Sequence, residues 1–129
     1  MTQRTKILLL DDDVFHRGLL SEGLEDYFDF DVTKVADLAS AQRALSDINP
    51  DLLLLDVVVG DDRFEVLNWV KSVRRGGPFQ NIPVLFVTAH FEEIAEHLRG
   101  IENTEILVKP FKFSDVIPKI RRLTGRTNR

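Results

Sequence analysis

The amino-acid sequence predicts an α/β fold, in which a doubly wound, five-stranded parallel sheet with strand order 2-1-3-4-5 carries helices on both faces. Three observations favour this fold. Short runs are apolar at every position, which is typical of parallel strands that are buried on both faces. The stretches between these runs have apolar residues at helical spacing. The two patterns alternate along the 129 residues, and right-handed crossovers between successive strands then produce a doubly wound sheet.

Five segments have the composition of strands. Four are almost wholly apolar and fit the interior of a parallel sheet, whereas the fifth is more polar and fits an edge. The apolar runs are 7–10, 52–55, 82–87 and 106–108, and the more polar run is 31–36.

Five helices are expected, one after each strand. The first covers about 14–28 and has Leu20, Leu24, Tyr27 and Phe28 on one face. The last opens with Ser114 as its N-cap, which places Pro118 in the first turn, where proline is tolerated. The other three helices lie between these two. The second has an apolar stripe at Leu38, Ala41, Leu45 and Ile48 and ends at 49–50, and the third has one at Val66, Leu67, Val70 and Val73 and ends at 76–78. The fourth is short and covers about 91–100.

Chemically capable residues follow four of the strands. They are Asp11, Asp12 and Asp13, then Asp56, then Thr88 and Ala89, and finally Lys109 and Pro110. In open α/β sheets ligands bind beyond the carboxyl ends of the strands, so we expect these side chains to converge. Converging carboxylates repel one another unless a cation is present, and an oxygen-rich set without His or Cys favours Mg²⁺ over zinc or copper. Asp13 has an alternative role as the N-cap of the first helix.

These residues resemble the signature of the receiver domain of two-component response regulators, over about residues 6–123, with 124–129 as a tail. The resemblance implies a single domain with the flavodoxin-like strand order. It implies that Asp56 is the phosphoacceptor, and that Asp11, Asp12 and Asp56, together with the backbone carbonyl of Val58, hold Mg²⁺. A carboxylate nucleophile with a divalent ion and a lysine is the minimum that such a transfer needs.

The resemblance also assigns roles to the other strand ends. Thr88 would donate a hydrogen bond to a phosphoryl oxygen, and Lys109 would pair with the phosphoryl group, with the Lys109–Pro110 bond in the cis form. The phosphodonor would be a sensor histidine kinase or a phosphotransfer protein. The domain would not be an enzyme in the usual sense, because it would catalyse only the phosphorylation and dephosphorylation of its own aspartate. Its downstream protein or fused output domain is left open, as is a weak homodimer.

The sequence departs from the family pattern on the output side. Ile106 stands three residues before Lys109, where an aromatic residue is usual. The loop 57–65 is one residue shorter than is usual in the family, and it has Arg63 where glycine is frequent. The fourth helix is shorter than usual, and the loop 101–104 that follows it is longer. Because Ile106 is stiff and has no ring, we expect the segment 90–93 to carry the signal into the fourth helix instead.

Composition excludes several classes of protein. The chain has no cysteine, which rules out disulfides, thiolate zinc sites and cysteine nucleophiles. Its net charge of −4 is unsuited to direct nucleic-acid binding. The apolar run 7–10 is too short for a signal peptide or a membrane span, so we expect a cytoplasmic protein with no membrane partner. Six basic residues between 112 and 129 are interpreted as cations of the last helix and tail rather than as a patch for an acidic partner.

Two other functions remain open. A phosphorylation-independent interaction module of the same fold is favoured by Ile106 and by the short fourth helix. A phosphatase of the haloacid-dehalogenase class would use Asp11 and Asp13 with Thr88 and Lys109, but it needs an acidic pair after the lysine, and only Asp115 follows. The chain is either a free-standing receiver or part of a longer regulator.

Overall fold

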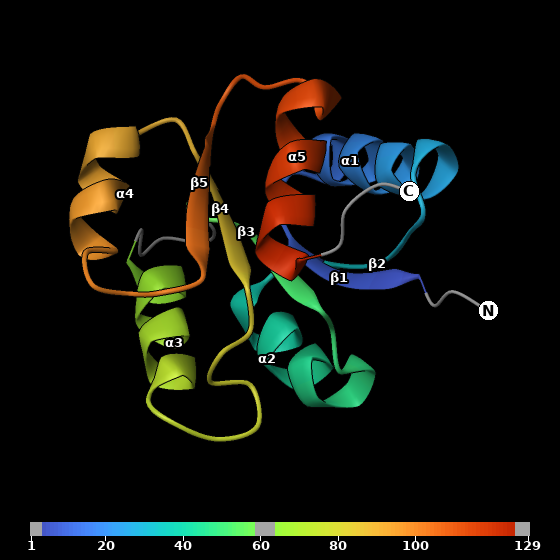
Figure 1. Ribbon diagram of the computed structural model, residues 1–129. Helices are drawn as coiled ribbons and strands as arrows, with labels where there is room; N and C mark the ends of the chain where they lie inside the picture. The colour runs from blue at the N-terminus through green and yellow to red at the C-terminus, as the bar shows by residue number, and fades with distance from the viewer. Residues whose placement is uncertain (1–3, 59–63, 126–129) are drawn as a thin grey trace.

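The computed structural model describes residues 4–58 and 64–125, and in it the strands and helices follow one another as predicted (Figure 1). All strand pairs are parallel and their order is β2-β1-β3-β4-β5, which confirms the predicted topology. The elements are β1 (Thr5–Leu10), α1 (Val14–Tyr27), β2 (Phe30–Val35), α2 (Leu38–Ile48), β3 (Leu52–Asp56), α3 (Glu65–Arg74), β4 (Val84–Thr88), α4 (Phe91–His97), β5 (Thr104–Val108) and α5 (Phe113–Thr124).

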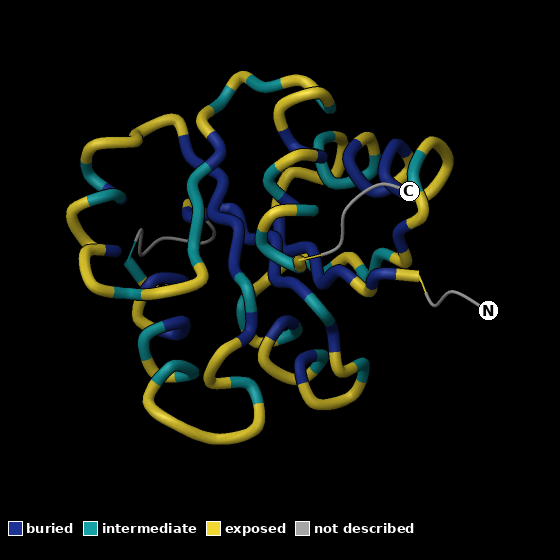
Figure 2. Tube along the Cα trace, in the orientation of Figure 1, coloured by how far each residue is buried: buried dark blue, intermediate teal, exposed yellow. Residues whose placement is uncertain are grey.

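The apolar strands build two cores at once, because successive side chains of a strand point to opposite faces of the sheet. In β1, Ile7 and Leu9 face α1 and α5, whereas Leu8 and Leu10 face α2, α3 and α4. Figure 1 shows these two helical layers, and in Figure 2 the buried residues run along the strands between them. A strand that needs apolar residues on both sides cannot alternate, which explains the runs of leucine.

Strand register brings the carboxyl ends of the strands to one edge. Leu10 pairs with Leu55, Asp56 with Val87, and Thr88 with Val108. The backbone N–H of Lys109 extends this ladder by donating to the carbonyl of Thr88 at 2.8 Å. The residues after β1, β3, β4 and β5 therefore meet, and the ends of β4 and β5 point to the top of Figure 1.

Helix α1 buries a different set of side chains from the predicted one. Tyr27 is 81% exposed, so its assignment to the core face was wrong. Tyr27 ends the helix, and Phe28, in extended backbone, takes the apolar position beside the rings of Phe30 and Phe113. Gly23 is buried where a Cβ would lie 2.0 Å from the Phe113 ring, so glycine is what allows α1 and α5 to approach each other.

Helix α5 begins two residues earlier than predicted. Phe113 is its first residue and Lys112 occupies the N-cap position, so Ser114 is not the cap. The carboxylate of Asp115 accepts a hydrogen bond from the N–H of Lys112 at 2.9 Å and satisfies this end of the helix. Pro118 consequently lies inside the helix, beyond the first turn, where its missing N–H leaves the ladder one bond short.

The other predicted bounds hold closely. Helix α4 is short, as predicted, but it ends at His97 rather than near Gly100, and β5 begins at Thr104 rather than at Ile106. On β5, Glu105 accepts hydrogen bonds from Lys119 and Arg122 of α5, which supports the structural interpretation of these cations. Within the two described ranges, no helix is long and apolar enough to cross a membrane.

Candidate functional site

Three buried polar side chains lie at the carboxyl edge of the sheet. Asp11, Asp56 and Thr88 are 2%, 6% and 2% exposed, and each stands at or directly after the end of a central strand. Because buried polar groups lower stability unless they are satisfied, such a cluster indicates a functional site.

Asp56 is the last residue of β3, and both of its carboxylate oxygens are engaged. Oδ2 accepts a hydrogen bond from Nζ of Lys109 at 2.7 Å, and Oδ1 accepts one from the N–H of Val58 at 3.0 Å. Burial raises the pKa of Asp56 above its ordinary value of 3.8, although the hydrogen bond and charge of Lys109 act in the opposite direction. The negative charge of Asp11 also raises this pKa.

Lys109 reaches Asp56 from the end of β5, which lies two strands away from β3 in the sheet. It follows β5, its ammonium is partly exposed, and its bond to Pro110 is cis, as the resemblance implies. The amino group therefore supplies a positive charge beside the buried carboxylate and still contacts solvent.

Asp11 is held by the start of α1. Its Oδ1 accepts a hydrogen bond from the N–H of Asp13 at 2.9 Å, and its Oδ2 contacts Nδ1 of His16. The guanidinium of Arg17 donates to the Asp11 carbonyl at 2.8 Å. The sequence interpretation, which treated the cluster as free of histidine, missed His16 and Arg17. A weak signal was available, because the first turn of a helix that follows a strand directly lies over the end of that strand.

Asp13 is the N-cap of α1, which confirms its alternative role. Its carboxylate accepts hydrogen bonds from the N–H groups of Phe15 and His16, each at 3.0 Å, and these bonds lower the pKa of Asp13. The phosphatase interpretation needs Asp13 as a second catalytic acid, so the cap role counts against it. Asp12, between the two, is exposed.

Thr88 ends β4, and its hydroxyl oxygen accepts a hydrogen bond from the N–H of His90 at 2.9 Å. Ile106 is partly buried and packs against the core that α2, α3 and α4 share. Beyond Val58, the expected differences in the 57–65 loop, Arg63 among them, fall largely in 59–63, outside the described residues.

The donor chemistry of the site fits a hard divalent cation. Two buried carboxylates face the same edge, and the charge of one already raises the pKa of the other. In this conformation, however, all four carboxylate oxygens of Asp11 and Asp56 have partners. Among the described side chains, no group of three His, Cys, Asp or Glu is gathered closely enough to hold a metal ion. A cation at this edge would therefore compete with these partners for the carboxylate oxygens.

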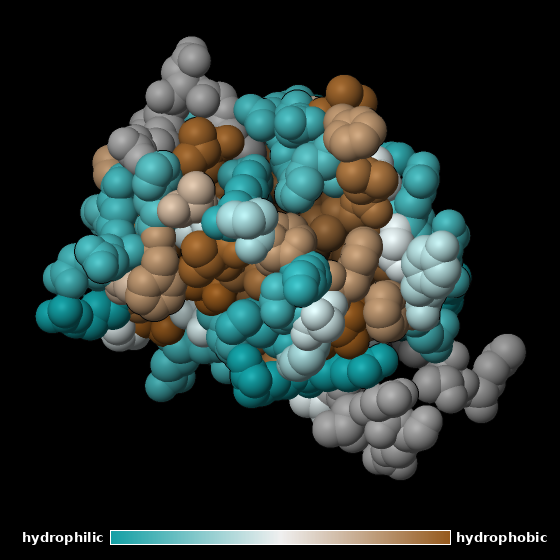
Figure 3. Space-filling view, turned by 90° about the horizontal axis from the view of Figure 1, so that it is seen from above, coloured by the Kyte–Doolittle hydropathy of each residue, from teal (hydrophilic) through white to brown (hydrophobic). Residues whose placement is uncertain are grey.

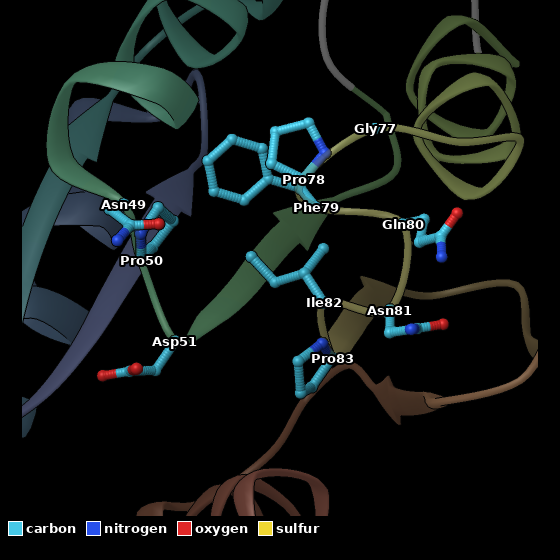
Figure 4. A pocket seen from close by; sticks show the side chains of 10 residues that line it. All are labelled: Asn49, Pro50, Asp51, Gly77, Pro78, Phe79, Gln80, Asn81, Ile82 and Pro83. Atoms are coloured by element: carbon cyan, nitrogen blue, oxygen red, sulfur yellow. The ribbon is translucent and has the colours of Figure 1, made fainter.

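A pocket at the opposite edge of the sheet contains none of these groups. It lies between residues 49–51 and 77–83, where the rings of Pro78 and Phe79 and the side chain of Ile82 gather (Figure 4). The carboxylate of Asp51 points away from these apolar side chains and accepts a hydrogen bond from the N–H of Lys6 at 2.8 Å. We assign no role to this pocket.

The family profile of the response regulator receiver domain matches residues 7–121, and the chain belongs to this family. Its curated relatives include the DNA-binding dual master transcriptional regulator RpaA of Synechocystis sp., which is 32% identical over 127 residues. The transcriptional regulatory protein ResD of Bacillus subtilis is 31% identical over 131 residues. These alignments cover 96% and 98% of this chain but 51% of each relative, so the chain spans about half their length.

Solved structures agree with this assignment. The chemotaxis protein CheY4 of Vibrio cholerae is 26% identical, with a TM-score of 0.81 over 93% of this chain and 98% of that one. The receiver domain of NtrX from Brucella abortus is also 26% identical, with a TM-score of 0.78 over 94% of this chain and 99% of that one. The protein is thus a receiver domain, a signalling module of response regulators.

Proposed function

We propose that this receiver accepts a phosphoryl group on Asp56 from a histidine kinase or a phosphotransfer protein. The observation that carries the proposal is the contact between the buried Asp56 and the partly exposed Lys109, which joins the end of β3 to the end of β5. A buried carboxylate with a lysine at 2.7 Å is a nucleophile placed next to the charge that its product needs.

The transfer balances without any further reactant. An oxygen of the Asp56 carboxylate attacks the phosphorus atom of a phosphohistidine, the P–N bond breaks, and the donor imidazole leaves with the bonding electron pair. The acyl phosphate that forms carries more negative charge than the carboxylate did. Lys109, at 2.7 Å from Oδ2, then pairs with a phosphoryl oxygen.

Mg²⁺ would be held by the carboxylates of Asp11, Asp12 and Asp56 and by the carbonyl of Val58, as the resemblance implies. When bound, the ion neutralises charge on the transferring group. The raised pKa of Asp56, to which the charge of Asp11 contributes, supports a need for a cation at this edge.

We further propose that Thr88 links the phosphoryl group to α4. Its hydroxyl oxygen accepts the N–H of His90, the residue that precedes the first turn of α4. If the Thr88 side chain shifts so that its hydroxyl donates to a phosphoryl oxygen, the distance to the His90 N–H changes, and the hold of Thr88 on the segment 90–93 is weakened. The change then reaches a partner protein or an output domain through α4 rather than through Ile106.

The surface around the acceptor supports docking of a protein donor. Five large apolar side chains close to the site residues in the sequence are exposed: Val14, Phe15, Val58, Phe91 and Val108. Seen from above, the molecule shows apolar surface between polar regions (Figure 3). Mixed surfaces of this kind are typical of protein interfaces.

The test is intact mass after incubation with Mg²⁺ and acetyl phosphate. The native chain should gain the mass of one phosphoryl group, and Asp56→Asn should gain none. The matched control is Asp47→Asn, which alters an exposed aspartate of α2 and should be labelled like the native chain. Equal labelling of Asp56→Asn and native protein would show that Asp56 is not the acceptor.

A native chain that takes no label from acetyl phosphate or from phosphohistidine donors would favour the phosphorylation-independent module. The position of Ile106, packed without a ring that could move between core and solvent, is the observation on that side.

A further inference from the structure

The His16 imidazole contacts a carboxylate of the proposed metal site, and the proposed function gives it no role. His16 lies in the first turn of α1, and its Nδ1 contacts Oδ2 of Asp11. The other side of the ring meets the edge of Phe111, with ring centroids 5.7 Å apart. The ring therefore lies between a buried carboxylate and an aromatic side chain of the β5–α5 loop, and it remains 32% exposed.

The two oxygens of Asp11 differ in how easily they can be freed. Oδ1 accepts the backbone N–H of Asp13, and Asp13 is itself fixed as the N-cap of α1 by two hydrogen bonds. Oδ2 is held by a side chain, which can rotate without disturbing the helix. Because the carboxylate is only 2% exposed, a cation reaches it most readily where a movable partner gives way. His16 is the partner that can leave.

We propose that His16 is a positioning residue that holds Oδ2 of Asp11 in the metal-free protein and must give up this oxygen when Mg²⁺ binds. The inference rests on the proposed Mg²⁺ site. It makes His16 a competitor of the metal, so that the native chain binds Mg²⁺ more weakly than its carboxylates alone would. It also couples metal binding to the contact between α1 and Phe111.

Two substitutions separate competition from a merely structural role. His16→Ala removes the competitor and leaves the carboxylates, so the Kd for Mg²⁺ should fall by about threefold to tenfold, the factor of one hydrogen bond that no longer has to be broken. His16→Asn places an amide N–H near the former position of Nδ1 and should restore a Kd close to the native value. If His16 had only a structural role, His16→Ala would bind Mg²⁺ as weakly as the native chain or more weakly. There would then be no tighter binding for His16→Asn to reverse.

The control is His97→Ala, which removes an imidazole at the far end of α4, where it packs against Phe64. Its Kd should match that of the native chain. Calorimetric titration of the full chain with MgCl₂ gives the four Kd values. In the native chain, NMR should in addition show the ring resonances of His16 shifting on Mg²⁺ addition while those of His97 stay in place.

The outcomes are distinct. Tighter binding in His16→Ala, reversed in His16→Asn, together with a moving His16 ring, supports the proposal. Equal or weaker binding in His16→Ala, while the native chain binds Mg²⁺, overturns it and leaves the metal site intact. A native chain that binds no Mg²⁺ overturns both the metal site and the role of His16. The titration of the native chain alone distinguishes this result from the previous one.

Discussion

The ammonium of Lys109 lies 2.7 Å from Oδ2 of Asp56, although the two residues stand 53 positions apart in the chain. The pair joins the ends of β3 and β5 across β4, and the carboxylate is almost fully buried whereas the lysine is partly exposed. The lysine thus compensates a charge that the core would otherwise disfavour. Under the proposed function, the same lysine would neutralise charge on the phosphoryl group.

Removing the lysine alone should destabilise the protein. Lys109→Met leaves the Asp56 carboxylate buried without its cation, and the free energy of unfolding should fall by about 1–3 kcal/mol near pH 7. In the Asp56→Asn background the same substitution should change little, because no buried charge remains. Urea unfolding of the four proteins in EDTA gives the coupling, and strictly additive effects would contradict the pairing.

The raised pKa of Asp56 predicts a pH dependence of stability. Between the ordinary value of 3.8 and the higher folded pKa, the folded protein binds more protons than the unfolded chain. The contribution of Asp56 to the free energy of unfolding therefore falls as the pH rises through this window. In EDTA, native protein should lose stability relative to Asp56→Asn from about pH 4 upward. A difference that is constant with pH would show that the pKa is not raised.

Much of this site follows from the sequence because parallel strands bring their carboxyl ends to one edge. Asp11, Asp56, Thr88 and Lys109 each follow an apolar run, so predicting the strands also predicts their convergence. The cap role of Asp13 follows in the same way, from its position before a helical pattern.

Other features depend on packing that local patterns do not encode. Phe113 enters the core against Gly23, and this contact starts α5 before Ser114 and leaves Pro118 inside the helix. Tyr27 has the spacing of a core residue, but the chain leaves the helix there and Phe28 packs instead. His16 meets Asp11 only because α1 begins directly over the end of β1.

Mg²⁺ should stabilise the native fold. At a concentration ten times its Kd, a ligand that binds only the folded state adds about 1.4 kcal/mol to the free energy of unfolding. The melting temperature should therefore rise with Mg²⁺ relative to EDTA. Asp12→Ala should lose this response while keeping its fold in EDTA, since Asp12 is exposed. A native melting temperature indifferent to Mg²⁺ would argue against the metal site.

The phosphoryl signal should appear first near α4. The hydrogen bond from the His90 N–H to Thr88 is the element that a phosphoryl group would disturb. With beryllofluoride as a phosphoryl mimic, amide hydrogen exchange should change more over residues 88–100 than over α1 and α2. Asp56→Asn, treated identically, serves as the control. Unchanged exchange over 88–100 with the mimic bound would exclude this route.

Chemical mapping of the phosphoryl group identifies the acceptor residue itself. After labelling with acetyl phosphate and Mg²⁺, borohydride reduces an aspartyl phosphate to homoserine, which peptide mass mapping locates in the chain. The account predicts homoserine at position 56 and aspartate retained at positions 11, 12 and 13. Homoserine at any of those three positions, with Asp56 unchanged, would contradict it.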